Sequence, residues 1–249
     1  MRKPLMAGNW KMYKTAPETV AFLEKFKPLV EKSEHCDIAI CPTFVNLSAA
    51  VEAARGTRIG IGAQNLHWGK EGAFTGEVSG FMLKAVGCHY VIIGHSERRQ
   101  YFGETNATVL KRTQAALEYE LVPIVCVGER LEERESGDTV AVCREQFQNG
   151  IAGLTPDQFA KIIVAYEPVW AIGTGKTATP DMAADAHRTI RAEVTAKYGA
   201  EAASKTRILY GGSVKPDNVR NLMAQPEIDG ALVGGASLDP ISFASIVNF

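Results

Sequence analysis

The chain has 249 residues, of which 46% are hydrophobic and 22% are charged, so it can bury a large core. Lys and Arg together number 27 and Asp and Glu number 28, which gives a formal net charge of −1 with no basic or acidic tract. We therefore expect no nucleic-acid partner. Residues 1–11 contain no apolar signal-peptide core, and apolar runs such as residues 121–127 are too short to span a membrane. The expectation is a cytoplasmic protein without membrane association.

Eight short apolar segments, each typical of a buried strand, alternate with helical patterns along the chain. The expected strands are residues 5–7, 37–41, 59–63, 89–94, 121–127, 162–167, 207–210 and 230–233. The expected helices are one that begins after Thr15, residues 45–54, residues 96–102, one that begins after Thr105, residues 138–151, residues 180–198, residues 216–224, and one from Asp239 to residue 247. Gly199 is expected to end the longest helix.

None of the eight strands alternates between apolar and polar residues, so both faces of the sheet should be covered. This is the pattern of a parallel α/β fold. Eight strand–helix units in a chain of this length match one closed (β/α)8 barrel better than an open sheet. No linker divides the sequence, and we expect residues 1–249 to form a single catalytic domain.

A long, glycine-rich loop over residues 64–79 carries Trp68 near its start and Phe74 farther along. Structureless loops of this length are uncommon and usually functional. Exposed aromatic residues on a protruding loop favour contact with a partner subunit. The alternative is a loop that folds back on its own surface.

Polar residues follow several of the expected strands. Asn9 and Lys11 follow the first strand, His95 and Glu97 the fourth, and Glu167 the sixth. In a barrel all strand ends of one polarity meet at the same rim, where barrel enzymes place their chemistry. These side chains should therefore converge, which indicates an enzyme.

Glu167 is followed by Pro168, which restricts the glutamate to extended backbone geometry, and then by an apolar, glycine-containing segment. A carboxylate beside such a segment suggests a general base under a cover that excludes water. The alternative is a solvated glutamate in an ordinary loop. His95 precedes an expected short helix, whose N-terminus disfavours an imidazolium, so we expect a neutral ring.

Glycines after the last two strands indicate a phosphate site. Residues 211–213 read Gly-Gly-Ser, and Gly234 and Gly235 follow the eighth strand. Glycine lets backbone N–H groups approach an anion closely, and these loops are the usual phosphate position in barrels. The P-loop and dinucleotide motifs are incomplete, since Trp170 and Asn65 stand where glycines are required, so no nucleotide cofactor is expected.

The cysteines and histidines show neither a disulfide nor a metal pattern. The cysteines are five in number, with no CxxC spacing, which favours free, mostly buried thiols in a reducing compartment. The histidines show no ligand spacing, so we expect no metal site. The cysteines are Cys36, Cys41, Cys88, Cys126 and Cys143.

Six segments spread along the chain carry a family resemblance. They are residues 7–12 (AGNWKM), 72–79 (GAFTGEVS), 91–99 (VIIGHSERR), 165–175 (AYEPVWAIGTG), 210–214 (YGGSV) and 232–238 (LVGGASL). Together they resemble the triosephosphate isomerase family. The resemblance implies a TIM barrel that interconverts dihydroxyacetone phosphate and D-glyceraldehyde 3-phosphate through an enediol(ate), in glycolysis and gluconeogenesis, without a cofactor.

The resemblance also implies residue roles. Glu167 would be the base that moves a proton between adjacent carbons, and His95 the electrophile at the substrate oxygens. Lys11 would supply positive charge, Asn9 would contact substrate, and Glu97 would support the site or transfer protons. The residues implied to hold the phosphate are Gly173, Ser213, Gly234 and Gly235.

The family resemblance further implies a homodimer in which residues 72–79, with Phe74 and Thr75, reach into the neighbouring subunit. Two other functions stay open at this point. One is a phosphate-binding barrel lyase or aldolase that uses Lys11 as a Schiff base. The other is a non-catalytic barrel that serves binding or assembly.

Overall fold

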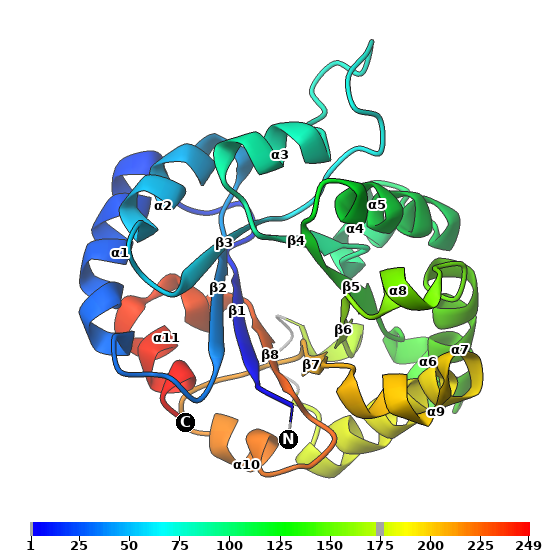
Figure 1. Cartoon of the computed structure of the whole chain (residues 1–249). Helices are drawn as coiled ribbons and strands as arrows, with labels where there is room; N and C mark the ends of the chain where they lie inside the picture. The colour runs from blue at the N-terminus through cyan, green and yellow to red at the C-terminus, as the bar shows by residue number, and fades with distance from the viewer. Residues whose placement is uncertain (1, 173–176) are drawn as a thin grey trace.

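The computed structural model describes residues 2–172 and 177–249. Within these residues eight parallel strands follow one another around a closed barrel, and helices form a ring outside it (Figure 1). The strands are β1 (Leu5–Asn9), β2 (Asp37–Cys41), β3 (Ile59–Ala63), β4 (Tyr90–Ile93), β5 (Val122–Val127), β6 (Ile163–Tyr166), β7 (Ile208–Tyr210) and β8 (Gly230–Val233). The predicted α/β barrel is confirmed, with every strand within two residues of its expected bounds.

The helices vary widely in length. The longer ones are α1 (Ala16–Val30), α2 (Leu47–Ala54), α5 (Asn106–Glu118), α7 (Thr139–Gly150), α9 (Pro180–Lys205) and α11 (Pro240–Val247). The shorter ones are α3 (Gly80–Val86), α4 (Ser96–Tyr101), α6 (Leu131–Glu135), α8 (Pro156–Phe159), α10 (Val219–Met223) and the 3-10 segments η1 (Phe44–Asn46), η2 (Val169–Ala171) and η3 (Gly235–Leu238).

Local sequence signals set most helix boundaries. Thr15 and Glu18 form the capping box at the start of α1, and Thr105 and Asp239 accept backbone hydrogen bonds that cap α5 and α11. The expectation that Gly199 ends the long helix that begins at Pro180 is confirmed, because Gly199 has φ 89° and ψ 165° and so leaves the helical conformation. A second helical segment follows this kink directly, so α9 as a whole extends to Lys205. The short helices α3, α6 and α8 are absent from the sequence-based prediction.

The strands separate two apolar cores. Alternate side chains point into the barrel, whereas residues such as Met6 point outward and pack with Leu23, Phe26 and other helix residues. Both faces of the sheet are therefore buried, as the continuous apolar strands predict. The interior of the barrel is filled by Leu5, Ala7, Ala39, Cys41, Tyr90, Ile92, Ile124, Cys126, Ile163, Ala165, Leu209 and Leu232.

The loop of residues 64–79 leaves the body of the barrel between β3 and α3 and projects from it (Figure 1). An isolated bridge joins His67 to Ser79 near its base. Phe74 is 48% exposed, and the centroid of its ring lies 4.1 Å from that of His67. The loop is thus long, protruding and partly apolar, as the sequence predicts.

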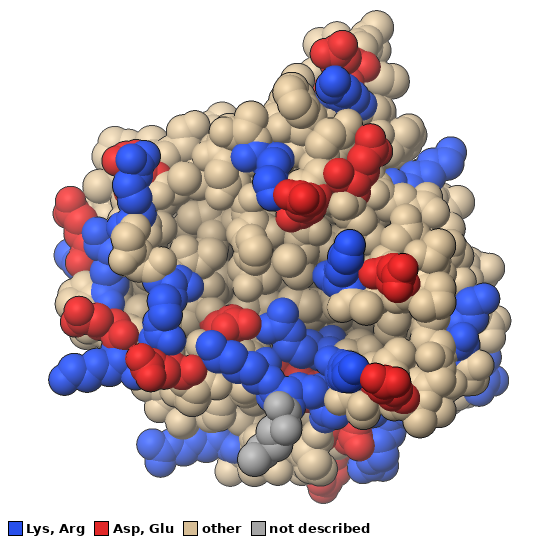
Figure 2. All heavy atoms as spheres, in the orientation of Figure 1, with Lys and Arg blue, Asp and Glu red and all other residues tan. Residues whose placement is uncertain are grey.

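All five cysteines are free and buried, which confirms the prediction from their number and spacing. Burial raises the pKa of Cys36 to about 11 and those of Cys88 and Cys143 to about 12, so these thiols stay protonated. On the face shown in Figure 2, Lys and Arg are interspersed with Asp and Glu. Among the described helices, none combines the length and the apolar character that crossing a membrane requires.

Closure of the barrel depends on Gly230 in β8. This residue pairs with Leu5 in β1 and has φ 131°, a conformation that other residues avoid. A β-carbon at Gly230 would lie 2.0 Å from the carbonyl oxygen of Leu5. The last strand can join the first only because no side chain is present there.

Replacing Gly230 with alanine should lower the free energy of unfolding by more than about 3 kcal/mol, since the methyl group would overlap the Leu5 backbone. The matched control is Gly56→Ala, where φ is 75° and a β-carbon would meet no atom within 4 Å. That control should cost only about 1–2 kcal/mol, from backbone conformation alone. Urea unfolding of both variants measures the difference, and equal losses would show that β8 closes without this contact.

Candidate active site

A cavity of about 360 Å³ opens at the ends of the strands where the chain leaves the barrel. The residues predicted from strands one, four and six border it, together with those after β7 and β8, with one exception. Glu97 does not line the cavity and instead pairs with Lys11, which does. Among the residues that line it are Asn9, Lys11, His95, Glu167, Ser213, Gly234 and Gly235. The predicted convergence of these residues is therefore present in the fold.

The end of β1 places Lys11 through a strained turn. Lys11 has φ 50°, which is unusual for a residue with a side chain. The Asn9 side chain accepts a hydrogen bond from Lys11 N–H at 3.0 Å, and Gln64 donates to the Lys11 carbonyl at 2.8 Å. Lys11 Nζ forms an ion pair with Glu97. The side chains of Asn9 and Gln64 thus hold the backbone of the turn, and that of Glu97 holds the Lys11 ammonium group.

The end of β4 places His95 as the N-terminal cap of α4. The backbone N–H of Glu97 donates to His95 Nδ1 at 3.2 Å, and a carboxylate oxygen of Glu97 lies 3.6 Å from the same atom. His95 is only 5% exposed. Because Nδ1 faces a helix N–H group, the free ring nitrogen Nε2 points the other way, toward Glu167.

Glu167 is the most deeply buried charged residue of the cavity, at 2% exposed. Its backbone N–H donates to Val127 O at 2.8 Å, which fixes the start of the turn. One carboxylate oxygen lies 2.9 Å from His95 Nε2, and the other accepts from the Ser96 N–H at 3.0 Å. Each carboxylate oxygen therefore has a donor, which a buried charge requires.

The two buried groups shift each other's titration. Burial alone would raise the pKa of Glu167, but His95, the Ser96 N–H group and Lys11 together lower it below its usual value. Burial alone would lower the pKa of His95, but the charge and hydrogen bond of Glu167 raise it. This coupling keeps Glu167 ionised near neutral pH.

The protonation state of His95 is subject to opposing influences. The Glu97 N–H group needs a lone pair on His95 Nδ1, which favours a neutral ring with its proton on Nε2. The Glu167 carboxylate favours the imidazolium instead. A neutral His95 therefore stays a prediction.

The loops after β7 and β8 bring bare backbone to the cavity. A β-carbon at Gly211 would lie 2.8 Å from Glu167 Cγ, and one at Gly212 would lie 2.2 Å from the hydroxyl oxygen of Tyr210. These approaches require glycine. Gly234 precedes η3, and Gly235 begins it. The glycines leave room in which backbone N–H groups can meet an anion.

The segment after Glu167 is anchored to the barrel through Glu129. Tyr166 Oη and Trp170 Nε1 both donate to the same carboxylate oxygen of this buried residue, at 3.0 and 2.9 Å. Val169–Ala171 form the short segment η2 beside the cavity. Gly173, which we expect at the phosphate, lies outside the described residues.

Phe74 and Thr75 lie in the protruding loop and do not line the cavity, as expected for residues assigned to a subunit contact. The backbone N–H of Ser96, which donates to Glu167, is absent from the predicted site, because no side-chain pattern identifies a backbone donor. In the described part of the chain, no group of three or more His, Cys, Asp or Glu could hold a metal ion.

A closed parallel barrel with a carboxylate, an imidazole, an ammonium and two glycine loops around one cavity at the strand ends is the arrangement of a (β/α)8-barrel enzyme with a phosphate-bearing substrate. The sequence comparisons agree with this class. The chain belongs to the triosephosphate isomerase family, whose sequence model matches residues 4–249. This is a family of isomerases.

Three relatives, each named triosephosphate isomerase, show how extensive the similarity is. The protein of Solibacter usitatus is 74% identical over 249 residues, which covers all of both chains. Those of Citrifermentans bemidjiense and Moorella thermoacetica are 57% and 56% identical over 249 residues, with 100% of this chain and 99% of each relative covered.

Replacing His95 with leucine should raise the pKa of Glu167, because burial would then act without the opposing charge and hydrogen bond of the imidazole. In the unchanged protein the carboxylate should titrate below the usual glutamate value of about 4.3. Carbon-13 NMR of glutamate-labelled protein measures both values. The control is His89→Leu at an exposed position. An unchanged Glu167 titration in the His95 variant would contradict the coupling.

Proposed function

We propose that this chain interconverts dihydroxyacetone phosphate and D-glyceraldehyde 3-phosphate, in glycolysis and gluconeogenesis, with Glu167 as the base. The observation that carries the proposal is one buried carboxylate held 2.9 Å from an imidazole nitrogen, in a cavity that an ammonium and glycine loops also line. Membership of the triosephosphate isomerase family supports the substrate pair.

The reaction needs more than a base, because a proton beside a carbonyl group is only weakly acidic. As Glu167 removes it, negative charge develops on the carbonyl oxygen. Preplaced donors that meet this charge usually supply the largest share of catalysis. We assign His95 Nε2 as the donor, Lys11 as the nearby positive charge and Asn9 as a further substrate contact, with Glu97 holding Lys11 in place.

Glu167 must change partners for this to happen. In the substrate-free site its two oxygens are engaged by His95 and by the Ser96 N–H group. A substrate that enters between the base and the imidazole separates them. His95 Nε2 is then free to donate to a substrate oxygen, and Glu167 is free to accept a proton from carbon.

The phosphate group would hold the substrate while the proton moves. We assign this contact to Ser213, Gly234 and Gly235, together with Gly173. Binding energy from a group remote from the reacting carbons can be used to orient them. A phosphate handle thus suits a substrate of only three carbons.

We also propose that residues 1–249 act as one catalytic domain in the cytoplasm. The five free, buried thiols support a reducing compartment. A Schiff-base lyase that uses Lys11 would form a covalent adduct with borohydride and a carbonyl substrate, whereas an isomerase would not. A non-catalytic barrel would give no proton exchange from triose phosphate in deuterated water.

Replacing Glu167 with glutamine should lower kcat by at least about 10²–10⁴-fold, since the amide cannot act as a base. A coupled assay of triose phosphate isomerisation measures the loss. The control is Glu135→Gln, at an exposed position in α6, which should keep its full rate. Near-normal turnover of a folded Glu167→Gln protein would rule out the assigned base.

A second subunit is the partner that we propose for the protruding loop. Phe74 is 48% exposed, and Tyr101 and Phe102 at the end of α4 are 68% and 67% exposed. Thr75 beside Phe74 is also exposed. Exposed apolar groups of this size favour a protein–protein contact, and the family resemblance favours a second copy of this chain.

Replacing Phe74 with aspartate should raise the dissociation constant of the homodimer by at least about 30-fold, because an aromatic anchor would become a buried charge. Sedimentation equilibrium measures this constant. The control is Ile241→Asp, since Ile241 is also an exposed apolar residue, at 69%, but lies in α11. An unchanged dimer in the Phe74 variant, or a monomeric parent protein, would overturn the assignment.

A further inference from the structure

The end of β5 lies directly against the backbone of Glu167. A β-carbon at Gly128 would lie 1.8 Å from the Glu167 carbonyl oxygen, so only glycine permits this approach. Glu167 N–H donates to Val127 O at 2.8 Å, and Val169 N–H donates to Glu129 O at 3.0 Å. Val127 and Glu129, on either side of Gly128, therefore hold the backbone N–H groups of the two residues on either side of Pro168.

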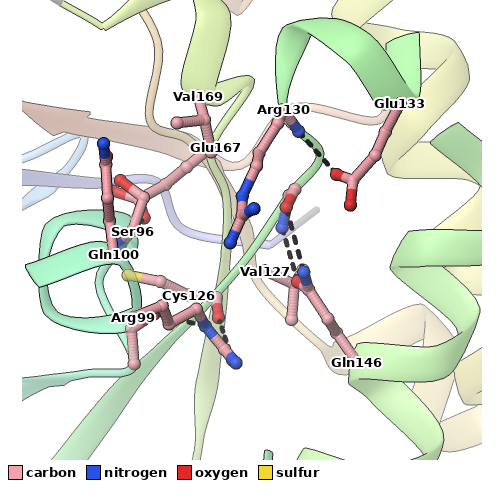
Figure 3. A pocket seen from close by; sticks show the side chains of 12 residues that line it. Ser96, Arg99, Gln100, Cys126, Val127, Arg130, Glu133, Gln146, Glu167 and Val169 are labelled. Atoms are coloured by element: carbon pink, nitrogen blue, oxygen red, sulfur yellow. Dashed lines mark hydrogen bonds between the residues drawn. The ribbon is translucent and has the colours of Figure 1, made fainter. Parts of the chain in front are cut away.

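A single side chain holds the peptide groups of Gly128 itself. Gln146, from α7, accepts a hydrogen bond from Gly128 N–H at 2.8 Å and donates one to Gly128 O at 3.0 Å (Figure 3). A primary amide can do both at once, whereas a carboxylate accepts only and an ammonium donates only. Gln146 thus pairs with both polar backbone groups of the residue packed on Glu167.

A cavity of about 80 Å³ lies beside this contact, behind the candidate base (Figure 3). Gly128, Gln146, Glu167 and Arg130 are among its lining residues. Its volume is enough for a few water molecules. Side-chain packing therefore leaves space into which the end of β5 could shift, and the amide of Gln146 opposes that shift.

We propose that Gln146 is a positioning residue, which sets the place of the Glu167 carboxylate through the backbone of Gly128. This inference rests on the proposed role of Glu167 as the base. Gln146 does not line the substrate cavity, so it would act on the rate of proton transfer and leave substrate binding intact. A small displacement of a base can cost up to about 10²-fold in rate.

The test is Gln146→Met, which keeps the length of the side chain and removes both hydrogen bonds. We expect kcat to fall about tenfold while KM stays within about twofold, because the phosphate contacts are untouched. The matched control is Gln148→Met. Gln148 lies two residues along in α7, is exposed and contacts Glu193, so its kcat should not change. A normal kcat for Gln146→Met overturns the inference.

A double-mutant cycle separates positioning from general damage to the fold. Glu167→Asp withdraws the carboxylate by one methylene group. If Gln146 acts by positioning that carboxylate, the fold-loss in kcat of the double variant should be smaller than the product of the fold-losses of Gln146→Met and Glu167→Asp alone. Losses that multiply would mean that Gln146 acts independently of the base, which overturns the inference.

Two further variants complete the test. If Gln146→Met does not fold, Gln146→Glu retains the acceptor for Gly128 N–H and loses the donor, so kcat should fall several-fold at unchanged KM, and a normal kcat would again overturn the inference. Glu167→Gln separates the two hypotheses. If it is inactive while Gln146→Met is normal, only the positioning role fails. If it is active, the base assignment fails and the inference fails with it.

Discussion

The hydrogen bonds between β8 and β1 turn a row of parallel strands into a ring. This closure determines where every functional group lies, because in a closed parallel barrel each strand ends at the same rim. Asn9, His95 and Glu167 are far apart in the sequence, yet each follows the end of a strand and so reaches one cavity. The contact that permits closure, Gly230 against Leu5, carries no functional group itself.

Within this frame the site is organised by one buried charge. An ionised carboxylate with 2% exposure is stable only if donors compensate for the lost water, and His95 and the Ser96 N–H group do so. The same donors suit the reaction that we propose. A donor that stabilises a carboxylate in the empty site can stabilise an oxyanion of the substrate once the carboxylate has moved away, so little reorganisation is needed.

The sequence predicts this architecture well where the signal is local. Apolar runs locate the strands, and Pro168 identifies Glu167 as a residue held in extended geometry at a strand end. Gly199 correctly marks where the helical backbone of α9 is interrupted, but nothing local predicts that a second helical segment follows directly. The Ser96 N–H group and Gln146 could not be predicted. One is a backbone donor, and the other resembles any polar residue of a surface helix until folding brings it to Gly128.

The surroundings of Glu167 suggest a division between what is fixed and what can move. Glycine lies against it directly after both neighbouring strands, Gly128 after β5 at its carbonyl oxygen and Gly211 after β7 at its Cγ atom. Bare backbone on two sides leaves the main chain of Glu167 few alternative positions, especially while Gln146 holds the peptide groups of Gly128. The carboxylate, by contrast, is held only by hydrogen bonds that a substrate can replace. The backbone of Glu167 is therefore fixed, while its carboxylate can change hydrogen-bond partners. A base that moves one proton between two adjacent carbons requires both properties.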